Sequence, residues 1–143
     1  MKMVEELVAY GHQNILGTHS MTFEITRAPN LSRRGDCVIG VNATRAPSDF
    51  SLHFKNLCRH EGTQITILLE AGSLTDVIQG SGSPGLRFID RNEMVGRKSS
   101  FISNRTIMVH ANKAARDIKR SLINALTSPK SILKVRISAE DSI

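Results

Sequence analysis

Strand-period alternation is the feature that most constrains the fold of this chain. In five stretches, apolar side chains occupy every second position, and most of the residues between them are polar or small. These stretches are residues 21–26, 37–43, 65–70, 106–111 and 133–138. Because successive side chains of a strand point to opposite faces, a period of two is typical of half-buried strands. Shorter runs at 4–10, 74–80 and 86–90 bring the predicted strands to eight, and Ala71-Gly72-Ser73 predicts a hairpin turn.

Two segments change to helical period. In residues 48–60, apolar side chains recur at i, i+4, i+7 and i+8, with Ser48 as the expected N-cap. Cys58 falls on this apolar face and is expected in the core. In residues 113–126 a second apolar stripe follows Asn112, which we expect to cap the helix. The cationic residues of this segment lie off the stripe, so the second helix is predicted to be amphipathic and basic.

These patterns predict a mainly β fold with two helices, an α+β protein with a sandwich or barrel-like core. The 143 residues are enough for one globular domain, 1–143. The order strand, strand, strand, helix, strand occurs twice and suggests a duplication with internal halves 1–71 and 72–143. Such halves would share one core about a pseudo-twofold axis, and a cleft on that axis would be the natural binding site.

The sequence predicts a cytoplasmic protein without a membrane segment. No stretch approaches the roughly 18 consecutive apolar residues of a membrane-spanning helix. The first six residues include two glutamates where a signal peptide needs an apolar run. Cys37 and Cys58 form no CxxC pair, so we expect two reduced thiols. The oligomeric state is not indicated by any of these patterns.

Positive charge is concentrated in the last third of the chain. Residues 1–90 hold 8 basic and 9 acidic side chains, whereas residues 91–136 hold 11 basic and 2 acidic ones. A local excess of this kind favours a polyanion partner, although a solvated face that maintains solubility is the simpler alternative.

The phosphate-binding hypothesis rests on residue types in this basic region. Arginine forks and serine hydroxyls are common ligands of phosphate oxygens. The candidates are Arg97, Lys98, Ser99, Arg105, Lys113, Arg116, Lys119 and Arg120. The strand face with Lys134 and Arg136 could extend them. An aromatic content of 4% argues against stacking of many bases, so we expect contact with structured RNA or DNA backbone, or capture of a nucleotide.

The glycine-rich segment 80–85 is a weaker phosphate-binding candidate. It lacks the lysine and the following helix of a phosphate-binding loop, and therefore predicts a turn. Its backbone N–H groups could still receive an anion.

The alternative hypothesis is a metal- or cysteine-dependent enzyme with a site built from His12, His19, Asp36 and Cys37. The two histidines and Cys37 are suitable zinc ligands, although their spacing matches no zinc motif. Cys37 could instead be a nucleophile activated by a histidine or by Arg33-Arg34. Against catalysis, strand parity predicts that Cys37 points into the core, and the histidines and Asp36 could simply cap turns. Whether the protein is an enzyme stays open at this point.

Several short segments of the sequence also resemble the motifs of a family of small archaeal proteins known as domain of unknown function 371. The resemblance runs over essentially the whole chain. Its motifs are Tyr10 to Ile15, Thr18-His19, Thr22 to Thr26, Arg34 to Ala43, Arg97 to Ser99, Ser103 to Thr106 and Ala111 to Ala115. Gln13 stands where the resemblance leads us to expect proline, and Asn112 where it leads us to expect aspartate. The resemblance implies a mainly β sandwich or barrel-like core and supplies no catalytic residues.

Overall fold

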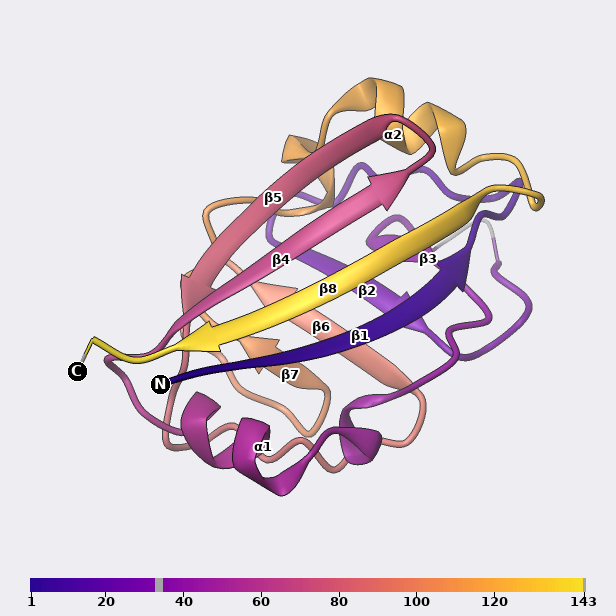
Figure 1. Ribbon diagram of the computed structural model, residues 1–143. Helices are drawn as coiled ribbons and strands as arrows, with labels where there is room; N and C mark the ends of the chain where they lie inside the picture. The colour runs from indigo at the N-terminus through magenta and orange to yellow at the C-terminus, as the bar shows by residue number, and fades with distance from the viewer. Residues whose placement is uncertain (33–34, 143) are drawn as a thin grey trace.

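The computed structural model describes residues 1–32 and 35–142 and contains two four-stranded sheets packed face to face (Figure 1). The first half holds β1 (Lys2–Tyr10), β2 (Thr22–Thr26), β3 (Val38–Gly40), the 3-10 turn η1 (Pro47–Asp49), α1 (Leu52–Cys58) and β4 (Gln64–Ala71). The second half holds β5 (Leu74–Ser81), β6 (Glu93–Arg97), β7 (Thr106–Met108), the 3-10 turn η2 (Ala115–Asp117), α2 (Arg120–Ala125) and β8 (Ile132–Glu140).

The two sheets differ in strand direction. Sheet A has the order β1-β8-β4-β5 and is antiparallel throughout. Sheet B has the order β3-β2-β6-β7; its central pair is antiparallel, and each edge strand is parallel to its neighbour. The predicted α+β sandwich is therefore confirmed, and its two sheets do not close into a barrel.

The core lies between the sheets, where the alternating pattern placed it. In β8, Leu133, Val135 and Ile137 are at most 2% exposed, whereas Lys134 and Arg136 point outward. Sheet B contributes Phe23 and Ile25 from β2 and Met94 from β6. Burial of apolar surface at about 25 cal/mol per Å² is the main driving force for bringing these two faces together.

The element order repeats, and the pairing exchanges strands between the halves. β1 pairs with β8, the last strand of the second half, and β5 pairs with β4, the last strand of the first half. Exchanging the halves reverses the order of both sheets, so a pseudo-twofold axis passes between β4 and β8 and between β2 and β6. Accordingly, α1 lies beside the β1 edge and α2 beside the β5 edge (Figure 1).

One predicted strand is wrong, and another was missed. Residues 86–90 form no strand, because Phe88 has a φ of +52° and packs its ring into the core from a loop. β6 lies a few residues later and was hidden by its mixture of charged residues and glycine. Gly96 is required there, because a Cβ atom would lie 2.2 Å from the Phe23 ring of β2.

Both helices are shorter than predicted, and their caps differ. Ser51, not Ser48, caps α1 by accepting a hydrogen bond from Phe54 N–H, since Ser48 lies within η1. Asn112 does not cap a helix; its Oδ1 accepts the N–H of Gln79 and closes the edge of sheet A. The hairpin is confirmed, with Gly72 at a φ of +61° between β4 and β5.

Among the residues that the structure describes, no helix has the length and apolar character needed to cross a membrane.

Candidate functional site

The repeated architecture separates structural side chains from specialised ones. A residue whose counterpart in the other half makes the same contact is explained by the fold. A charged residue whose counterpart is neutral needs another explanation. Equivalent positions are identified by their place in equivalent elements, for example Tyr10 and Ser81, which form matching bridges to Val41 and Val109.

Two buried carboxylates perform the same structural task in the two halves. Glu5 of β1 accepts the N–H of Ser51 at 2.6 Å and pairs with Arg45 at 2.8 Å. Asp76 of β5 accepts the N–H of Lys119 at 2.9 Å and pairs with Lys113 at 2.5 Å. Burial alone would raise the pKa of Asp76, but these hydrogen bonds hold it below its ordinary value. Lys113 therefore has a structural role that Arg45 repeats.

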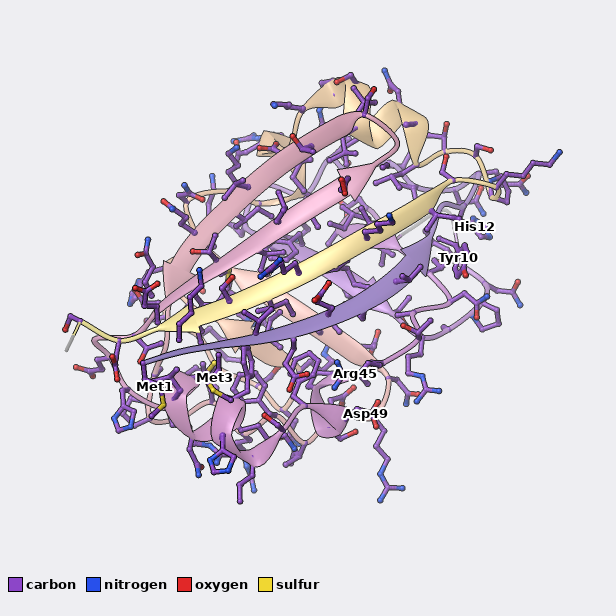
Figure 2. All side chains as sticks on the ribbon, viewed as in Figure 1. Met1, Met3, Tyr10, His12, Arg45 and Asp49 are labelled. Atoms are coloured by element: carbon purple, nitrogen blue, oxygen red, sulfur yellow. The ribbon has the colours of Figure 1, made fainter. Side chains whose placement is uncertain are left out.

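A second repeated arrangement surrounds the 3-10 turns. Asp49 accepts the N–H of Ala46, and Asp117 accepts the N–H of Ala114, each at 2.9 Å. Asp117 also pairs with Lys98 at 2.6 Å, where Asp49 has Arg27 at 3.9 Å. Figure 2 shows Arg45 and Asp49 beside each other near β1, where Arg45 donates to the Asp49 carbonyl oxygen.

The predicted histidines occupy turn-capping positions. His19 Nδ1 accepts the N–H groups of Met21 and Thr22 at 3.1 Å, and its counterpart Asp90 accepts the two equivalent N–H groups. His12 lies just beyond the end of β1 (Figure 2), where its Nδ1 accepts the N–H of Asn14. Ser83, the counterpart of His12, accepts the N–H of Gly85. Each histidine thus caps a turn that a serine or an aspartate caps in the other half.

The metal candidates are only partly brought together. Backbone hydrogen bonds from Thr18 and His19 to the carbonyl oxygen of Asp36 bring His19 close to the Asp36-Cys37 segment. In the part of the chain that the structure describes, no three His, Cys, Asp or Glu side chains form a group that could hold a metal ion. Zinc binding and catalysis by these residues stay predictions.

Cys37 does not occupy the core position that strand parity predicted. It precedes β3 and is half-buried, because the register of β2 and β3 shifts beside it. Burial and the nearby Glu24 carboxyl raise the pKa of the Cys37 thiol. The thiol form is therefore favoured at neutral pH, which is the opposite of what a nucleophile needs. Arg33 and Arg34, the predicted activating pair, lie outside the described residues. Cys58 is fully buried, as predicted.

A polar cluster lies on the outer face of sheet B, near the pseudo-twofold axis. Glu24 of β2 faces away from the core and is only 7% exposed. Arg105 Nη1 donates to Glu24 at 3.2 Å and to Glu93 of β6 at 3.3 Å. Burial, together with a hydrogen bond and the charge of Glu93, raises the pKa of Glu24 to about 7. The counterpart of Glu24 is Val95, so this cluster is not repeated.

Arg97 extends the cluster. Its Nε donates to Thr106 Oγ1 at 2.9 Å and its Nη2 donates to Ser103 Oγ at 3.1 Å. Its guanidinium carbon lies 5.0 Å from the centre of the Phe101 ring. Sequence reasoning found Arg97 and Arg105 but missed Glu24, Glu93 and Phe101. The only signal for Glu24 in the sequence is its place between two core-facing residues of the alternating run 21–26, which predicts that it points outward. An ordinary solvent-facing residue gives the same signal.

The remaining basic candidates lie along η2 and the start of α2. Lys119 Nζ donates to the Thr75 carbonyl oxygen, and Arg120 donates to the carbonyl oxygens of Gly17, Ala115 and Ile118. Arg116 is fixed through its backbone N–H, which donates to the His19 carbonyl oxygen. Its side chain makes no hydrogen bond or ion pair with any described residue. Ser99 Oγ accepts the N–H of Phe101.

Among the phosphate-binding candidates predicted from the sequence, five cations have neutral counterparts in the first half, and we call them the second-half cations. The pairs are Arg97 and Thr26, Arg105 and Cys37, Arg116 and Ser48, Lys119 and Ser51, and Arg120 and Leu52. Arg105 alone among them forms an ion pair among the described residues. Lys98 and Lys113, by contrast, repeat ion pairs of the first half.

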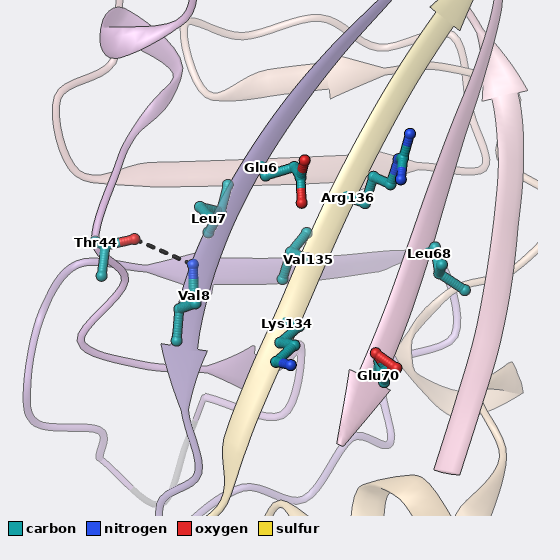
Figure 3. Close-up of a pocket in the computed structure, with 9 residues that line it drawn as sticks. All are labelled: Glu6, Leu7, Val8, Thr44, Leu68, Glu70, Lys134, Val135 and Arg136. Carbon is teal, nitrogen blue, oxygen red and sulfur yellow. Dashed lines mark hydrogen bonds between the residues drawn. The ribbon is translucent and has the colours of Figure 1, made fainter. Parts of the chain in front are cut away.

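Two other predicted phosphate-binding features do not belong with the second-half cations: the pair Lys134 and Arg136, and the glycine-rich segment 80–85. Lys134 and Arg136 line a cavity of about 530 Å³ on the outer face of sheet A (Figure 3). Arg97 and Arg105, by contrast, belong to the polar cluster on the outer face of sheet B. Glu6 and Glu70 line the same cavity, so its charges balance. In the glycine-rich segment, the N–H groups of Gly82 and Ser83 donate to carbonyl oxygens of the chain itself and are not free for an anion.

Comparison with known proteins agrees with the sequence resemblance. The sequence profile of a family described as a domain of unknown function (DUF371) matches residues 7–140. An uncharacterised protein of Methanocaldococcus jannaschii is 38% identical over 125 residues, which cover 87% of this chain and 92% of that protein.

Proposed function

The chain belongs to the DUF371 family, and we propose that it is a small cytoplasmic binding protein whose second half engages a phosphate-rich ligand, RNA or a nucleotide. The observation that carries the proposal is the set of second-half cations. The fold of the first half has neutral residues at all five positions. The first half therefore folds without charges at these positions. In the second half Arg120 has a structural role, and ligand binding gives a reason for the other four cations.

The chemistry of the second-half cations suits phosphate. Four of the five are arginines, whose planar forks donate two parallel hydrogen bonds to phosphate oxygens. Arg116 is held at its backbone while its side chain stays available. The hydrogen bond from Ala114 N–H lowers the pKa of Asp117, and the nearby Lys98 and Arg116 lower it further, so two cations share one carboxylate there. A polyanion would neutralise the remaining charge.

The cytoplasmic part of the proposal is supported by the cysteines. Cys37 and Cys58 are both free thiols in the structure. Free thiols are the usual state in the reducing cytoplasm, whereas exported proteins of this size more often carry disulfides.

Purification from source cells under native conditions tests the proposal. The chain has no Trp and one Tyr, so bound nucleic acid would dominate its absorbance at 260 nm. We expect retained nucleic acid or nucleotide that is released at high salt. A double variant, Arg97→Gln with Arg116→Gln, should retain much less. Its matched control is Arg91→Gln with Arg136→Gln, which removes the same charge from side chains that make no polar contact in the described chain. Equal retention by both variants would contradict the proposal.

A further inference from the structure

Phe101 is exposed where the other phenylalanines are buried. Its residue is 62% exposed, whereas Phe23, Phe50, Phe54 and Phe88 are at most 4% exposed. Single exposed apolar residues are common on protein surfaces, so exposure alone is not informative. Here, however, the ring lies beside Arg97, one of the second-half cations.

The structure holds the ring and the cation together. Arg97 is fixed by Thr106 and Ser103, and its guanidinium carbon lies 5.0 Å from the ring centre, within cation–π range. Phe101 is fixed at its backbone, where its N–H donates to Ser99 Oγ at 3.3 Å. Because the residue stays 62% exposed despite this contact, much of the ring surface remains open to a ligand.

The equivalent segment of the first half has no such ring. Residues 27–37 connect β2 to β3 as residues 98–105 connect β6 to β7, and they contain no aromatic residue. The exposed ring therefore occurs in the same half as the unpaired cations, and in the loop that begins beside Arg97.

We propose that Phe101 is a stacking platform for one nucleobase, with Arg97 and Ser99 beside it to receive the attached phosphate. The inference rests on the proposed function and specifies its ligand as a nucleotide, free or within single-stranded RNA. A base is a planar aromatic group, and stacking on an exposed side-chain ring is the common way in which proteins hold it without reading its sequence. A single platform also agrees with the low aromatic content, since one ring can hold only one base.

The absence of tryptophan from the sequence makes a direct test possible. Phe101→Trp in the full chain creates a sole tryptophan whose fluorescence is quenched when a base stacks on it. The matched control is Leu52→Trp, which places a tryptophan at a 66% exposed position of α1, the first-half counterpart of Arg120. AMP, an adenosine oligonucleotide and ribose 5-phosphate are titrated at low salt, and the affinity of the unsubstituted chain is measured in parallel by calorimetry.

We expect saturable quenching of Phe101→Trp by AMP or by the oligonucleotide, but not by ribose 5-phosphate, and no saturable quenching of Leu52→Trp. Phe101→Leu should weaken nucleotide binding by about tenfold and leave ribose 5-phosphate binding unchanged, as expected for loss of one stacking contact. Equal affinity for AMP and ribose 5-phosphate, without quenching, would overturn the stacking platform but leave the proposed function intact. If none of the three ligands binds, both proposals fail.

Discussion

Arg116 and Arg120 are separated by about one helical turn in sequence, but their side chains differ in the hydrogen bonds that they make. Arg120 donates hydrogen bonds to three carbonyl oxygens and ties the loop at Gly17 to η2 and α2. The Arg116 side chain makes no hydrogen bond or ion pair with any residue that the structure describes. A basic cluster in a sequence therefore contains both cations that hold the fold together and cations that are free to bind a ligand. Only the contacts in the structure distinguish the two kinds.

This difference predicts opposite results for two alanine variants. Arg120→Ala should lower the free energy of unfolding by about 2 kcal/mol, because it leaves three carbonyl oxygens without their charged donor. Arg116→Ala should change it by less than about 0.5 kcal/mol, as is usual for a surface side chain without hydrogen bonds or ion pairs. Urea denaturation measures both values, and a similar loss for the two variants would contradict the assignment.

Glu24 gives the protein a pH dependence near neutrality. Its pKa is raised from 4.5 to about 7, so between these values the folded chain holds a proton that the unfolded chain has released. Stability must therefore fall as pH rises through this window, and the penalty is fully present above it. We expect Glu24→Gln to remove this fall, because the amide cannot ionise.

Chemical denaturation at several pH values between 5 and 8 tests this prediction. The control is Glu61→Gln, which neutralises an exposed glutamate that makes no polar contact in the described chain. A fall in stability that is the same in wild type, Glu61→Gln and Glu24→Gln would show that Glu24 is not its cause.

At the scale of elements, each first strand holds the start of its own half's helix through one buried acid. Glu5 of β1 binds the N–H at the start of α1, and Asp76 of β5 binds the N–H at the start of α2. Each acid also pairs with the cation of the preceding loop. Such a carboxylate joins strand, loop and helix, and its loss leaves buried donors unsatisfied.

We expect Glu5→Gln and Asp76→Asn each to lower the free energy of unfolding by about 1–3 kcal/mol. For Asp76, whose pKa is lowered, the stabilisation is present above its ordinary pKa of 3.8 and is lost as pH falls through the folded-state pKa. Urea denaturation at neutral pH compares both variants with Asp90→Asn, which neutralises a half-buried turn cap. A loss no greater than that of Asp90→Asn would refute the shared role.

The elements also show which parts of the fold a sequence pattern can predict. β8 was predicted because each of its faces has one environment, apolar inside and polar outside. Residues 86–90 gave a false strand because Leu86 and Phe88 alternate correctly yet enter the core from a loop. β6 was missed because Gly96 and Arg97 meet requirements set by other segments, namely space for Phe23 and contacts with Thr106 and Ser103.

At the scale of the whole molecule, the two halves are interlocked. Each half gives its last strand to the first strand of the other, and β4 and β8 form the centre of sheet A. A separated half would leave two of its strands without their partners and would expose the apolar faces of both sheets. The repeat is therefore visible in the order of elements, whereas stability depends on the complete chain.

We expect fragments 1–71 and 72–143 to be unfolded when each is expressed alone, and to regain the dispersed NMR spectrum of the full chain when mixed. Spectra of the separate and mixed fragments measure this directly. A well-dispersed spectrum from either fragment alone would contradict the interlocked arrangement.

The candidate site could be predicted only in part for the same reason. Arg97 and Arg105 were found because local charge is visible in a sequence. Glu24 and Phe101 were missed because their importance depends on what the fold places beside them. Glu24 meets Arg105, which is 81 residues away in sequence, and the Phe101 ring is ordinary until Arg97 lies against it.

The salt dependence of RNA affinity tests the central claim most directly. Binding of a fluorescently labelled single-stranded RNA is measured between about 50 and 200 mM salt for the wild type, for Arg97→Gln with Arg116→Gln, and for Arg91→Gln with Arg136→Gln. Each phosphate contact contributes about −0.7 to the slope of log K against log salt, so the first double variant should reduce the slope by about 1.4 and the control pair should not. A slope near zero for the wild type, or the same slope for all three proteins, would contradict a phosphate-binding role for the second-half cations.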